Sequence, residues 1–384
     1  MIVEDLTLIE KLGKGTFGEV FLTKKKNDPQ VYATKKVAKN LVLQEKIKKY
    51  FNNEIYLLKN VGHPNIIKLF EIKQTVNNFY LRFEYCNGGG LSNCLASYMK
   101  MYGKPFPEEI VQHVMRKIVC GLQYLHKNKI IHRDLKLDNI LVHFPTEEDK
   151  KALRIMNSEV KIIDFGFARY LQNDDLAQSV LGSPINMDPM ILQKLRKIDN
   201  QEVFGYDEKA DIWSLGTIAY ELLIGAPPFD ANSYDELLEK INKGHYIIPN
   251  NLKLSKQGIS FLNGLLQYDP KQRLSVDDLF FHEFLVVDCQ KFEKVDLNKL
   301  SRQYSNTKEL VLSTKEWFFF ETPGSNEDSS KISAKMYSEN SQSKDTIQKV
   351  NERNLAQDKE EDFLGSLIGG LKEIQINKQA GRFI

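Results

Sequence analysis

The sequence contains little cysteine and no large excess of charge of either sign. Four cysteines, at positions 86, 94, 120 and 289, form no CxxC pair and no dense spacing. This usage is typical of a reducing compartment and argues against a disulfide-stabilised secreted domain. Lys and Arg number 53 and Asp and Glu number 51, so bulk charge gives no reason to expect direct nucleic-acid or membrane-surface binding.

Long apolar runs are also missing. No segment reaches the roughly 20 apolar residues that a membrane-spanning helix needs. The first ten residues, MIVEDLTLIE, carry no basic region followed by an apolar stretch, which argues against a secretory signal. The sequence therefore predicts a cytoplasmic protein, with the nucleus as an alternative. Its hydrophobic fraction of 42% is ample for a packed core.

Hydrophobic periodicity divides the chain into two kinds of structure. Residues 6 to about 37 alternate in the manner of strands, and a helix is expected from about 41 to 60. Strands resume in IIKLFEI and NFYLRFEY, whereas from Pro107 onward apolar residues recur at helical spacing. This pattern predicts an α+β fold with a small β-rich N-lobe, a larger helical C-lobe and a linker near 86–90.

The globular pattern covers residues 6–285, and the rest of the chain is expected to form a tail. Residues 286–320 are predicted to be a C-terminal extension. Residues 321–361 are rich in Ser, Asn, Lys and Glu and are predicted to be a disordered linker. Residues 362–384 could form a short amphipathic helix that binds a regulatory partner or docks on its own domain, although two adjacent glycines weaken it by roughly 1 kcal/mol each.

Glycines at positions 13, 15 and 18 separate the first two predicted strands. Glycine lets a backbone approach phosphate oxygens closely and adopt a positive φ without steric cost. A Rossmann dinucleotide site shares this GxGxxG spacing but requires a helix directly after the glycines. Here the strand EVFLTKKK follows, so the spacing predicts a hairpin that covers a nucleotide.

Lys35 is a candidate for binding the phosphates of that nucleotide. Alternation along the strand YATKKV places Lys35 on the same apolar side as Ala33, and Lys36 on the opposite side. A buried ammonium needs a negatively charged partner. Glu54, on the apolar face of the following helix, is the better candidate for this partner, and Glu45 is the weaker one.

The segment HRDLKLDN, residues 132–139, carries the residues that could transfer a phosphoryl group. Asp134 could accept the proton of an attacking hydroxyl, and Lys136 could neutralise charge on the transferred group. Asn139 could bind a metal through its amide oxygen, together with Asp164 of the motif DFG. Mg²⁺ prefers such oxygens in combination with substrate phosphates. Phosphoryl transfer requires chiefly positioning and charge neutralisation, and this set supplies both.

Each of these motifs alone has an ordinary structural explanation, but together and in this order they resemble the eukaryotic protein kinases. The resemblance continues through GSPINMDP, DIWSLG and DPKQRLS. It implies a bilobal kinase-like fold, ATP and Mg²⁺ as cofactors and protein hydroxyls as substrates. Within the kinases, IIDFGFARYLQ, GSPINM and EYCNGGGL are most similar to the ULK family, the autophagy-initiating kinases, whose members also include kinases with other roles.

The resemblance also assigns the contacts of the nucleotide. Phe83 would be the gatekeeper, the backbone near Glu84 and Cys86 would bond the adenine, and side chains from both lobes would sandwich the base. The full set of expected ATP contacts is Leu12, Gly13, Lys14, Gly15, Thr16, Phe17, Gly18, Glu19, Val20, Ala33, Lys35, Phe83, Glu84, Cys86 and Leu141.

Substrate class and regulation follow from the same resemblance. Lys136 and Ser183 imply serine/threonine substrates, and Asp211 would support the catalytic loop. Arg133 implies that a phosphate in the activation segment is bound by its guanidinium. Ser179 is the expected phosphosite, and Ser183 is the other candidate. A calcium- or lipid-regulated kinase with an autoinhibitory tail would need a basic amphipathic helix, which we do not find in the sequence.

Several positions depart from the family pattern. Gly90 stands where many relatives carry an acid that helps to bind the ribose, Asn186 replaces an aromatic residue of the substrate-facing loop, and Leu137 replaces a proline. The insertion HFPTEEDKKALRIMNSE, after the catalytic loop, is highly charged and is expected to be a solvated excursion.

The largest departure is Met190, in the place of a glutamate that normally pairs with an arginine, here Arg273. A buried guanidinium without a partner would destabilise the fold by several kcal/mol. We therefore expect a carboxylate or carbonyl within hydrogen-bonding reach of Arg273, with Glu202, Asp207 or another acid as the substitute, unless Arg273 is exposed. The departure also leaves open a second function, a pseudokinase scaffold that binds nucleotide without efficient transfer. An active kinase is favoured because the phosphate and metal machinery is present: Lys35, Glu54, Asp134, Asn139 and Asp164.

Overall fold

The computed structural model describes residues 2–3, 6–15, 18–43, 45–165, 168–170, 184–196, 207–231, 233–244 and 246–286. All of them belong to the first of the two units into which the chain divides, residues 1–306. Apart from Val286, the predicted tail segments lie outside the described residues, so the extension, the linker and the terminal helix stay predictions.

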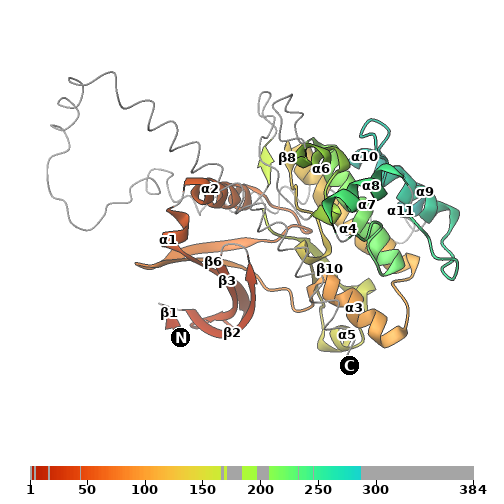
Figure 1. The fold of residues 1–384 in the computed structure, drawn as a ribbon. Coiled ribbons are helices and arrows are strands. Elements are labelled where there is room, and N and C mark those ends of the chain that lie inside the picture. The colour runs from red at the N-terminus through yellow and green to blue at the C-terminus, as the bar shows by residue number, and fades with distance from the viewer. Residues whose placement is uncertain are drawn as a thin grey trace, which may run out of the picture. The chain divides into compact units, whose positions relative to one another are not determined.

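The N-terminal part of the chain forms one antiparallel sheet, drawn in red and orange in Figure 1. Its strands follow the order β1-β2-β3-β4-β6-β5, so β5 lies at an edge and β6 pairs with β4 in the interior. The strands are β1 (Ile2–Val3), β2 (Leu6–Gly15), β3 (Gly18–Lys25), β4 (Val31–Ala38), β5 (Leu69–Gln74) and β6 (Asn78–Glu84).

Two helices, α1 (Lys39–Val42) and α2 (Glu45–Asn60), connect β4 to β5. The sequence predicted one helix from about 41 to 60, whereas the structure ends α1 at residue 42 and begins α2 three residues later. The apolar face of α2 packs on the sheet because its hydrophobic residues recur at helical spacing. Phe51 of this face lies 5.0 Å from Phe79 of β6, measured between ring centroids.

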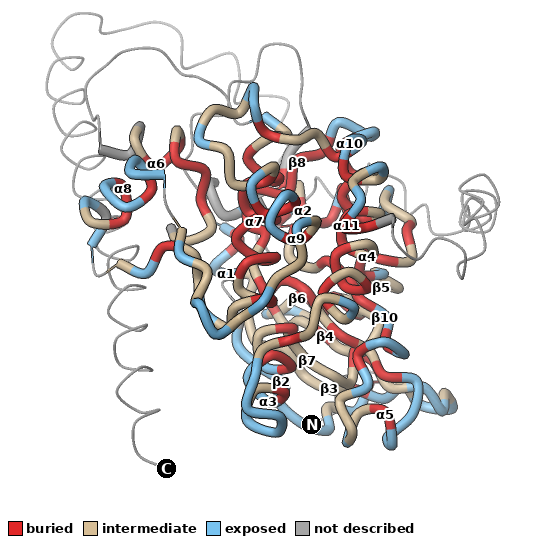
Figure 2. Tube along the Cα trace, turned by 90° about the vertical axis from the view of Figure 1, so that its right-hand side faces the viewer, coloured by how far each residue is buried: buried red, intermediate tan, exposed pale blue. Residues whose placement is uncertain are grey.

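The rest of the described chain is mainly helical, and α4 and α7 form its centre. The apolar stripe predicted after Pro107 lies on α4 and is buried. Figure 2 shows that α7 is buried along most of its length, as expected of a helix that is apolar on all sides. The helices are α3 (Leu91–Tyr102), α4 (Glu108–Lys127), α5 (Glu147–Lys151), α6 (Pro189–Arg196), α7 (Glu208–Ile224), α8 (Tyr234–Asn242), α9 (Lys256–Leu265), α10 (Val276–Phe281) and α11 (Glu283–Val286).

Short strands and 3₁₀ turns connect these helices, and two of the predicted site residues lie on them, Asn139 on η1 and Leu141 on β9. One small sheet has the order β10-β9-β7 and another pairs β11 with β8. The strands are β7 (Gly89–Gly90), β8 (Ile130–Ile131), β9 (Ile140–His143), β10 (Glu159–Ile162) and β11 (Arg169–Tyr170), and the 3₁₀ turns are η1 (Leu137–Asn139), η2 (Ile155–Asn157) and η3 (Pro184–Asn186).

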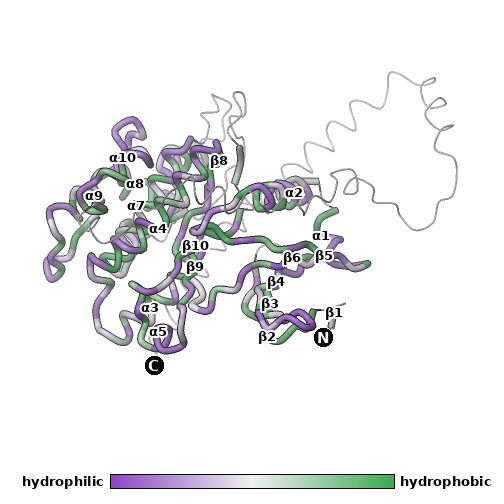
Figure 3. Tube along the Cα trace, turned by 180° about the vertical axis from the view of Figure 1, so that it is seen from behind, coloured by the Kyte–Doolittle hydropathy of each residue, from purple (hydrophilic) through white to green (hydrophobic). Residues whose placement is uncertain are grey.

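This architecture confirms the predicted α+β fold with a β-rich N-lobe and a helical C-lobe. Figure 3 shows hydrophilic and hydrophobic residues alternating along the chain, as expected where each element buries one face. Within the described residues, no helix combines the length and the apolar character that crossing a membrane would require.

The charged insertion after the catalytic loop is only in part the solvated excursion that its composition predicted, because most of its residues are exposed but a few are buried. Phe144 and Ile155 are fully buried in the C-lobe core, so the insertion contributes to packing. Its buried Asp149 accepts hydrogen bonds from the Thr146 hydroxyl at 2.8 Å and the Asn157 amide at 2.8 Å. The prediction holds only in part because charge counts describe the exposed face of a segment and say nothing about the few apolar residues that anchor it.

Candidate active site

The glycine hairpin has the geometry that the spacing predicted. Strands β2 and β3 pair directly, with Gly15 opposite Gly18, and the two residues between them lie outside the described residues. A β-carbon at Gly18 would come within 2.0 Å of the Lys36 carbonyl oxygen, so this position admits only glycine. The strand after the glycines excludes the Rossmann interpretation, which requires a helix there.

Two of the expected ATP contacts, Thr16 and Phe17, therefore have no described position, whereas Glu19 has one. Glu19 forms an ion pair with Lys11 across the hairpin, at 2.5 Å. The hydrogen bond and the charge of Lys11 lower the pKa of Glu19 below its ordinary value. The side chain of Glu19 is thus directed along the hairpin, which leaves its backbone as the part that a nucleotide would contact.

Lys35 on β4 and Glu54 on α2 form the ion pair that the sequence favoured. The Lys35 Nζ lies 2.8 Å from Oε1 and 3.2 Å from Oε2 of Glu54. Both side chains are largely buried, at 13% and 3% exposed, so the pair lies out of bulk solvent. Burial alone would lower the pKa of Lys35, but the carboxylates of Glu54 and Asp164 outweigh it and raise that pKa. Lys35 is therefore held as a cation.

The catalytic loop brings three predicted residues into one hydrogen-bonded group. Lys136 Nζ lies 2.9 Å from Oδ2 of Asp134. The amide nitrogen of Asn139 donates to the same oxygen at 2.9 Å and to the Asp134 carbonyl at 2.7 Å. Because the amide nitrogen of Asn139 is bound to Asp134, its amide oxygen is the atom of this side chain that could bind a metal.

The catalytic loop is hydrogen-bonded to α7 through Asp211. The buried Asp211 accepts the N–H of His132 and of Arg133, each at 2.9 Å, and a hydrogen bond from the His126 ring at 2.9 Å. Burial alone would raise the pKa of Asp211, but the bonds from His126 and His132 hold it below its ordinary value. Arg133 has a strained φ of 71°, and the two backbone bonds to the Asp211 carboxylate hold the loop in this conformation.

Asp164 lies two residues after the end of β10, and its negative charge contributes to raising the pKa of both Lys35 and Glu54. Its φ of 65° is unusual for a residue other than glycine. The following Phe165 is buried and lies 5.2 Å from the His132 ring, which anchors this turn on the catalytic loop. The backbone carbonyl of Asn139 accepts the N–H of Ile163, the residue before Asp164, at 2.9 Å, which joins this turn to the catalytic loop.

The oxygens of Asn139 and Asp164 fit a hard cation such as Mg²⁺, but they are few. In the part of the chain that the structure describes, no group of three or more His, Cys, Asp and Glu residues could enclose a metal ion. A cation held by these two residues would need further oxygens from substrate phosphates and water. This donor set suits a metal that arrives with a nucleotide better than a resident structural metal.

The predicted adenine contacts come from both lobes. Ala33 of β4 lies opposite Phe83 of β6, and Leu141 of β9 pairs with Gly90 of β7. Cys86, between the lobes, is buried, and burial raises the pKa of its thiol to about 12, so it is a neutral apolar contact. Phe83, the expected gatekeeper, thus lies on β6, Cys86 lies in the segment that connects β6 to β7, and Leu141 lies on β9.

Residues 6–285, well over half of the chain, match the protein kinase domain. The chain belongs to the protein kinase family. This confirms the resemblance that the motifs carried.

Curated relatives of this kinase domain include several serine/threonine kinases. It is 36% identical over 286 residues to serine/threonine-protein kinase ATG1c of Arabidopsis thaliana, which covers 74% of this chain and 36% of the relative. It is 35% identical over 286 residues to serine/threonine-protein kinase ULK3 of Xenopus laevis, covering 74% and 56%. Calcium-dependent protein kinase 4 of Plasmodium falciparum is similar at 32% over 312 residues, covering 79% and 55%. The kinase chain thus spans between about a third and just over half the length of these relatives.

The turn η3, which the family resemblance predicts to face the substrate, is anchored on α7. The Asn186 carbonyl accepts the Ser214 hydroxyl at 2.6 Å, and the Asn186 amide donates to the Thr217 hydroxyl at 2.7 Å. Asn186, in the place of an aromatic residue, is therefore bonded through both its backbone and its side chain. The candidate phosphosites Ser179 and Ser183 lie outside the described residues.

The expected partner of Arg273 exists, and it is Asp188. The Arg273 Nη1 donates to Oδ2 of Asp188 at 2.6 Å, and both side chains are buried. Asp207, one of the two named candidates, instead caps α7 by accepting the Lys209 N–H at 2.9 Å. Glu202, the other candidate, lies outside the described residues. The sequence does show an acid two residues before Met190, but which acid reaches Arg273 depends on the turn before α6.

Two other departures have little structural consequence. A β-carbon at Gly90 would meet the Ser92 hydroxyl at 3.4 Å and Asp138 at 3.8 Å, which is ordinary contact, so packing does not require glycine there. Leu137, in the place of a proline, is buried in the C-lobe core. Gly90 thus removes an acidic group from the linker without changing the backbone around it.

Sequence reasoning also missed residues that hold the site together. Asn53, next to Glu54 on α2, donates a hydrogen bond to the Ala168 carbonyl after the DFG motif. Lys161 of β10 binds Glu84 of the linker region, with Nζ 3.0 Å from Oε2. Both contacts join segments that are distant in sequence, and neither residue lies in a recognisable motif.

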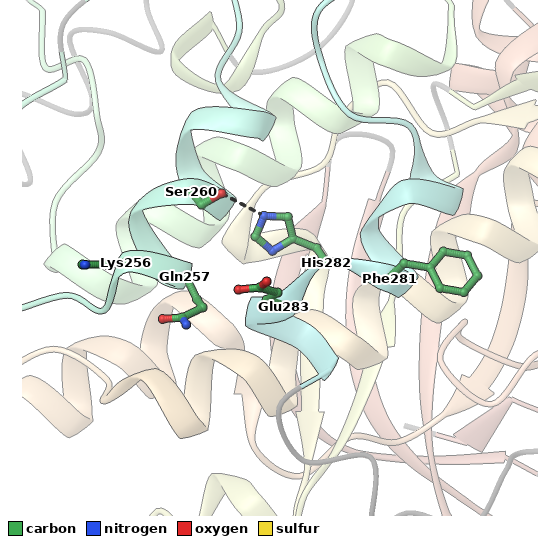
Figure 4. Close-up of a pocket in the computed structure, with 6 residues that line it drawn as sticks. All are labelled: Lys256, Gln257, Ser260, Phe281, His282 and Glu283. Atoms are coloured by element: carbon green, nitrogen blue, oxygen red, sulfur yellow. Dashed lines mark hydrogen bonds between the residues drawn. The ribbon is translucent and has the colours of Figure 1, made fainter.

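A pocket of about 510 Å³ lies on another part of the kinase domain (Figure 4). It contains none of the predicted nucleotide or catalytic residues. His282 accepts or donates a hydrogen bond with Ser260 at 3.3 Å, and Figure 4 shows Phe281 pointing away from the other labelled residues. Its lining residues are Lys256, Gln257, Ser260, Phe281, His282 and Glu283.

Proposed function

We propose that this chain is a serine/threonine protein kinase that transfers the γ-phosphate of ATP to protein hydroxyls. The observation that carries the proposal is the hydrogen-bonded group of Asp134, Lys136 and Asn139. It combines a buried carboxylate, a cation and an amide oxygen at one place in the fold. The similarity to serine/threonine kinases supports serine and threonine as acceptors.

Each side chain has a distinct task in this reaction. Asp134 accepts or orients the proton of the attacking hydroxyl as the new oxygen–phosphorus bond forms and the bond to ADP breaks. Lys136 lies 2.9 Å from that carboxylate and neutralises charge that develops on the transferred group. Lys35, held by Glu54, binds the phosphates that stay with ADP. Asn139 and Asp164 would hold Mg²⁺, which when bound supplies further charge neutralisation.

The competing function is a scaffold that binds nucleotide without efficient transfer. Met190 was the observation that favoured it, because a missing carboxylate would leave Arg273 unpaired. Asp188 supplies that carboxylate, which removes the main argument for an inactive fold. A cytoplasmic location, with the nucleus as an alternative, remains part of the proposal, as does a regulatory partner bound by the tail.

The test is transfer of radiolabelled phosphate from Mg-ATP to the protein itself and to a generic serine/threonine substrate. Asp134→Asn and Asp164→Asn should each lower the rate by roughly 10²-fold or more, because both remove charge from the reacting centre. Asp138→Asn, which changes an exposed carboxylate of the same loop, should retain transfer and serves as the matched control.

Two outcomes would contradict the proposal. Transfer that persists unchanged in both variants would show that other residues carry the reaction. No transfer from folded wild-type protein, even after treatment with an upstream kinase, would favour the scaffold, and binding of a fluorescent ATP analogue would then measure the nucleotide affinity.

A further inference from the structure

Arg273 is enclosed completely by the C-lobe. Its side chain is 0% exposed, and its guanidinium donates to the carbonyls of Lys209 at 2.5 Å and of Gln267 at 2.8 and 3.0 Å. The guanidinium also lies 5.2 Å from the Trp213 ring. Carbonyls satisfy hydrogen bonds but carry no net charge, so carboxylates must neutralise the cation: Asp188 binds it directly, and the charge of Asp207 acts on it as well.

Asp188 has a second task at the start of α6. Its Oδ1 accepts the Met190 N–H at 2.8 Å, and its carbonyl accepts the N–H groups of Ile191 and Leu192, each at 3.0 Å. Asp188 is therefore the N-cap of α6, with one carboxylate oxygen on the helix and the other on Arg273. A single short side chain thus joins α6 to the buried cation.

The substrate-facing turn η3 ends two residues before Asp188 and shares its support. Asn186 is bonded to Ser214 and Thr217 of α7, the helix whose Asp211 holds the catalytic loop. The position of this turn relative to the catalytic loop therefore depends on two anchors, α7 on one side and the Asp188–Arg273 pair on the other.

We propose that Asp188 is a positioning residue for the protein substrate, and that it performs in this chain the role that the family pattern gives to an acid at position 190. The inference rests on the proposed kinase function. A carboxylate at either position should serve, because the requirement is one negative charge on the buried guanidinium. The nucleotide site, built on other elements, should not depend on it.

The test compares Asp188→Ala with the transposed double variant Asp188→Ala/Met190→Glu. Asp188→Ala should raise the KM for the protein substrate by roughly tenfold or more, as expected for loss of a charge-assisted hydrogen bond, with the KM for ATP unchanged. The double variant should recover most of the lost affinity for the protein substrate. Ser255→Ala is the matched control, because Ser255 also caps a helix, accepting the Gly258 N–H at 2.9 Å, but that helix is α9 and not α6 or α7.

Several results would overturn the inference. Among them are an unchanged KM for the protein substrate in folded Asp188→Ala, an equal loss in both KM values, and a folded double variant without recovery. If Asp188→Ala does not fold, the double variant decides: wild-type kinetics support the transposition, and failure to fold contradicts it. If wild-type protein transfers no phosphate, the proposed function has failed, and the melting temperatures of the two variants still test whether position 190 can replace position 188.

Discussion

At the scale of single residues, two positions of the candidate site have a strained backbone. Arg133 and Asp164 both have φ near 70°, in a region that costs non-glycine residues on the order of 1–3 kcal/mol. Each is held there by its surroundings: Asp211 accepts the Arg133 N–H, and Phe165 packs beside His132. These contacts help to hold the two strained backbone conformations.

Glu221 of α7 supplies a prediction about pH. Burial, and then the negative charge of Asp138, raise the pKa of Glu221 to about 7 from an ordinary value of 4.5. Between pH 4.5 and pH 7, Glu221 therefore keeps its proton in the folded protein but has lost it in the unfolded chain. The contribution of Glu221 to the free energy of unfolding should fall by about 3 kcal/mol as the pH rises from below 4.5 to above 7, since one pKa unit is worth ~1.4 kcal/mol.

The measurement is urea unfolding of wild-type protein and Glu221→Gln at pH 5 and pH 8. The variant should be the more stable protein at pH 8 by roughly 1–3 kcal/mol, and the two should differ little near pH 5. Asp138→Asn should reduce the pH dependence only in part, because burial is the larger cause. Equal pH dependence in wild type and Glu221→Gln would show that Glu221 titrates normally.

At the scale of elements, the charged insertion supports the linker between the lobes. Asn87 exchanges two hydrogen bonds with the backbone of Phe144: its amide donates to the carbonyl at 2.9 Å, and its oxygen accepts the N–H at 2.8 Å. Gly88 donates to the Val142 carbonyl at 2.9 Å and would clash with the Phe144 ring if it carried a β-carbon. The insertion thus fixes the residues that follow Cys86.

Phe144→Ala should therefore affect both stability and nucleotide binding. Removing this buried ring should lower the free energy of unfolding by about 3–5 kcal/mol, the usual cost of a large cavity. We also expect the KM for ATP to rise, because Gly88 loses the ring that it packs against, although Asn87 keeps its bonds to the backbone of residue 144. Denaturant unfolding and steady-state kinetics measure the two effects.

Met156→Ala is the control for this experiment, since Met156 lies in the same insertion but is 46% exposed. It should change stability by no more than about 0.5 kcal/mol. A Phe144→Ala variant as stable as wild type would mean that the insertion contributes little to the core.

At the scale of the whole kinase domain, a few buried contacts join the N-lobe to the C-lobe. Asn65, in the loop after α2, donates to the Val160 carbonyl at 3.0 Å, and Ile67 donates to the Ile162 carbonyl at 2.9 Å. Lys161 lies between these two positions on β10 and binds Glu84 at the end of β6. The loop after α2 thus belongs structurally to β10, although it precedes β10 by almost a hundred residues.

The Lys161–Glu84 pair should contribute to the stability of this junction. Its side chains are 9% and 21% exposed, so the pair is partly screened from solvent. Glu84 also accepts the Lys68 N–H at 2.7 Å, which orients its carboxylate. In a double-mutant cycle of Lys161→Met and Glu84→Gln, the coupling energy should be roughly 0.5–3 kcal/mol.

Chemical unfolding of the four proteins gives this coupling energy. The double variant should be more stable than the sum of the single losses predicts, because it no longer leaves Glu84 without Lys161. Glu159, whose Oε2 lies 3.3 Å from Lys161 Nζ, still pairs with that lysine in Glu84→Gln, so the larger single loss should come from Lys161→Met. Additive losses would show that the pair contributes no interaction energy. Lys68→Met is a suitable control, because it retains the backbone N–H that Glu84 accepts.

Much of the fold and site could be predicted because the relevant signals are local. The strand that follows Gly18 is read from a few neighbouring residues, as are the helical spacing after Pro107 and the order of charged groups from Asp134 to Asn139. Such signals describe the backbone and the chemistry of one short segment, which is why they identified the kinase resemblance. The pairing of Lys35 with Glu54 followed from burial, since a buried cation requires a carboxylate on the nearest helix.

The sequence by itself thus determined the order of elements, the membership of the protein kinase family and the need for an acid opposite Arg273. Only the tertiary structure decided that this acid is Asp188, that Lys161 binds Glu84, and that the charged insertion is partly core. The physical reason is the range of the interactions. Local patterns follow from steric and hydrophobic preferences of adjacent residues, whereas the partner of a buried charge depends on which distant segments pack together.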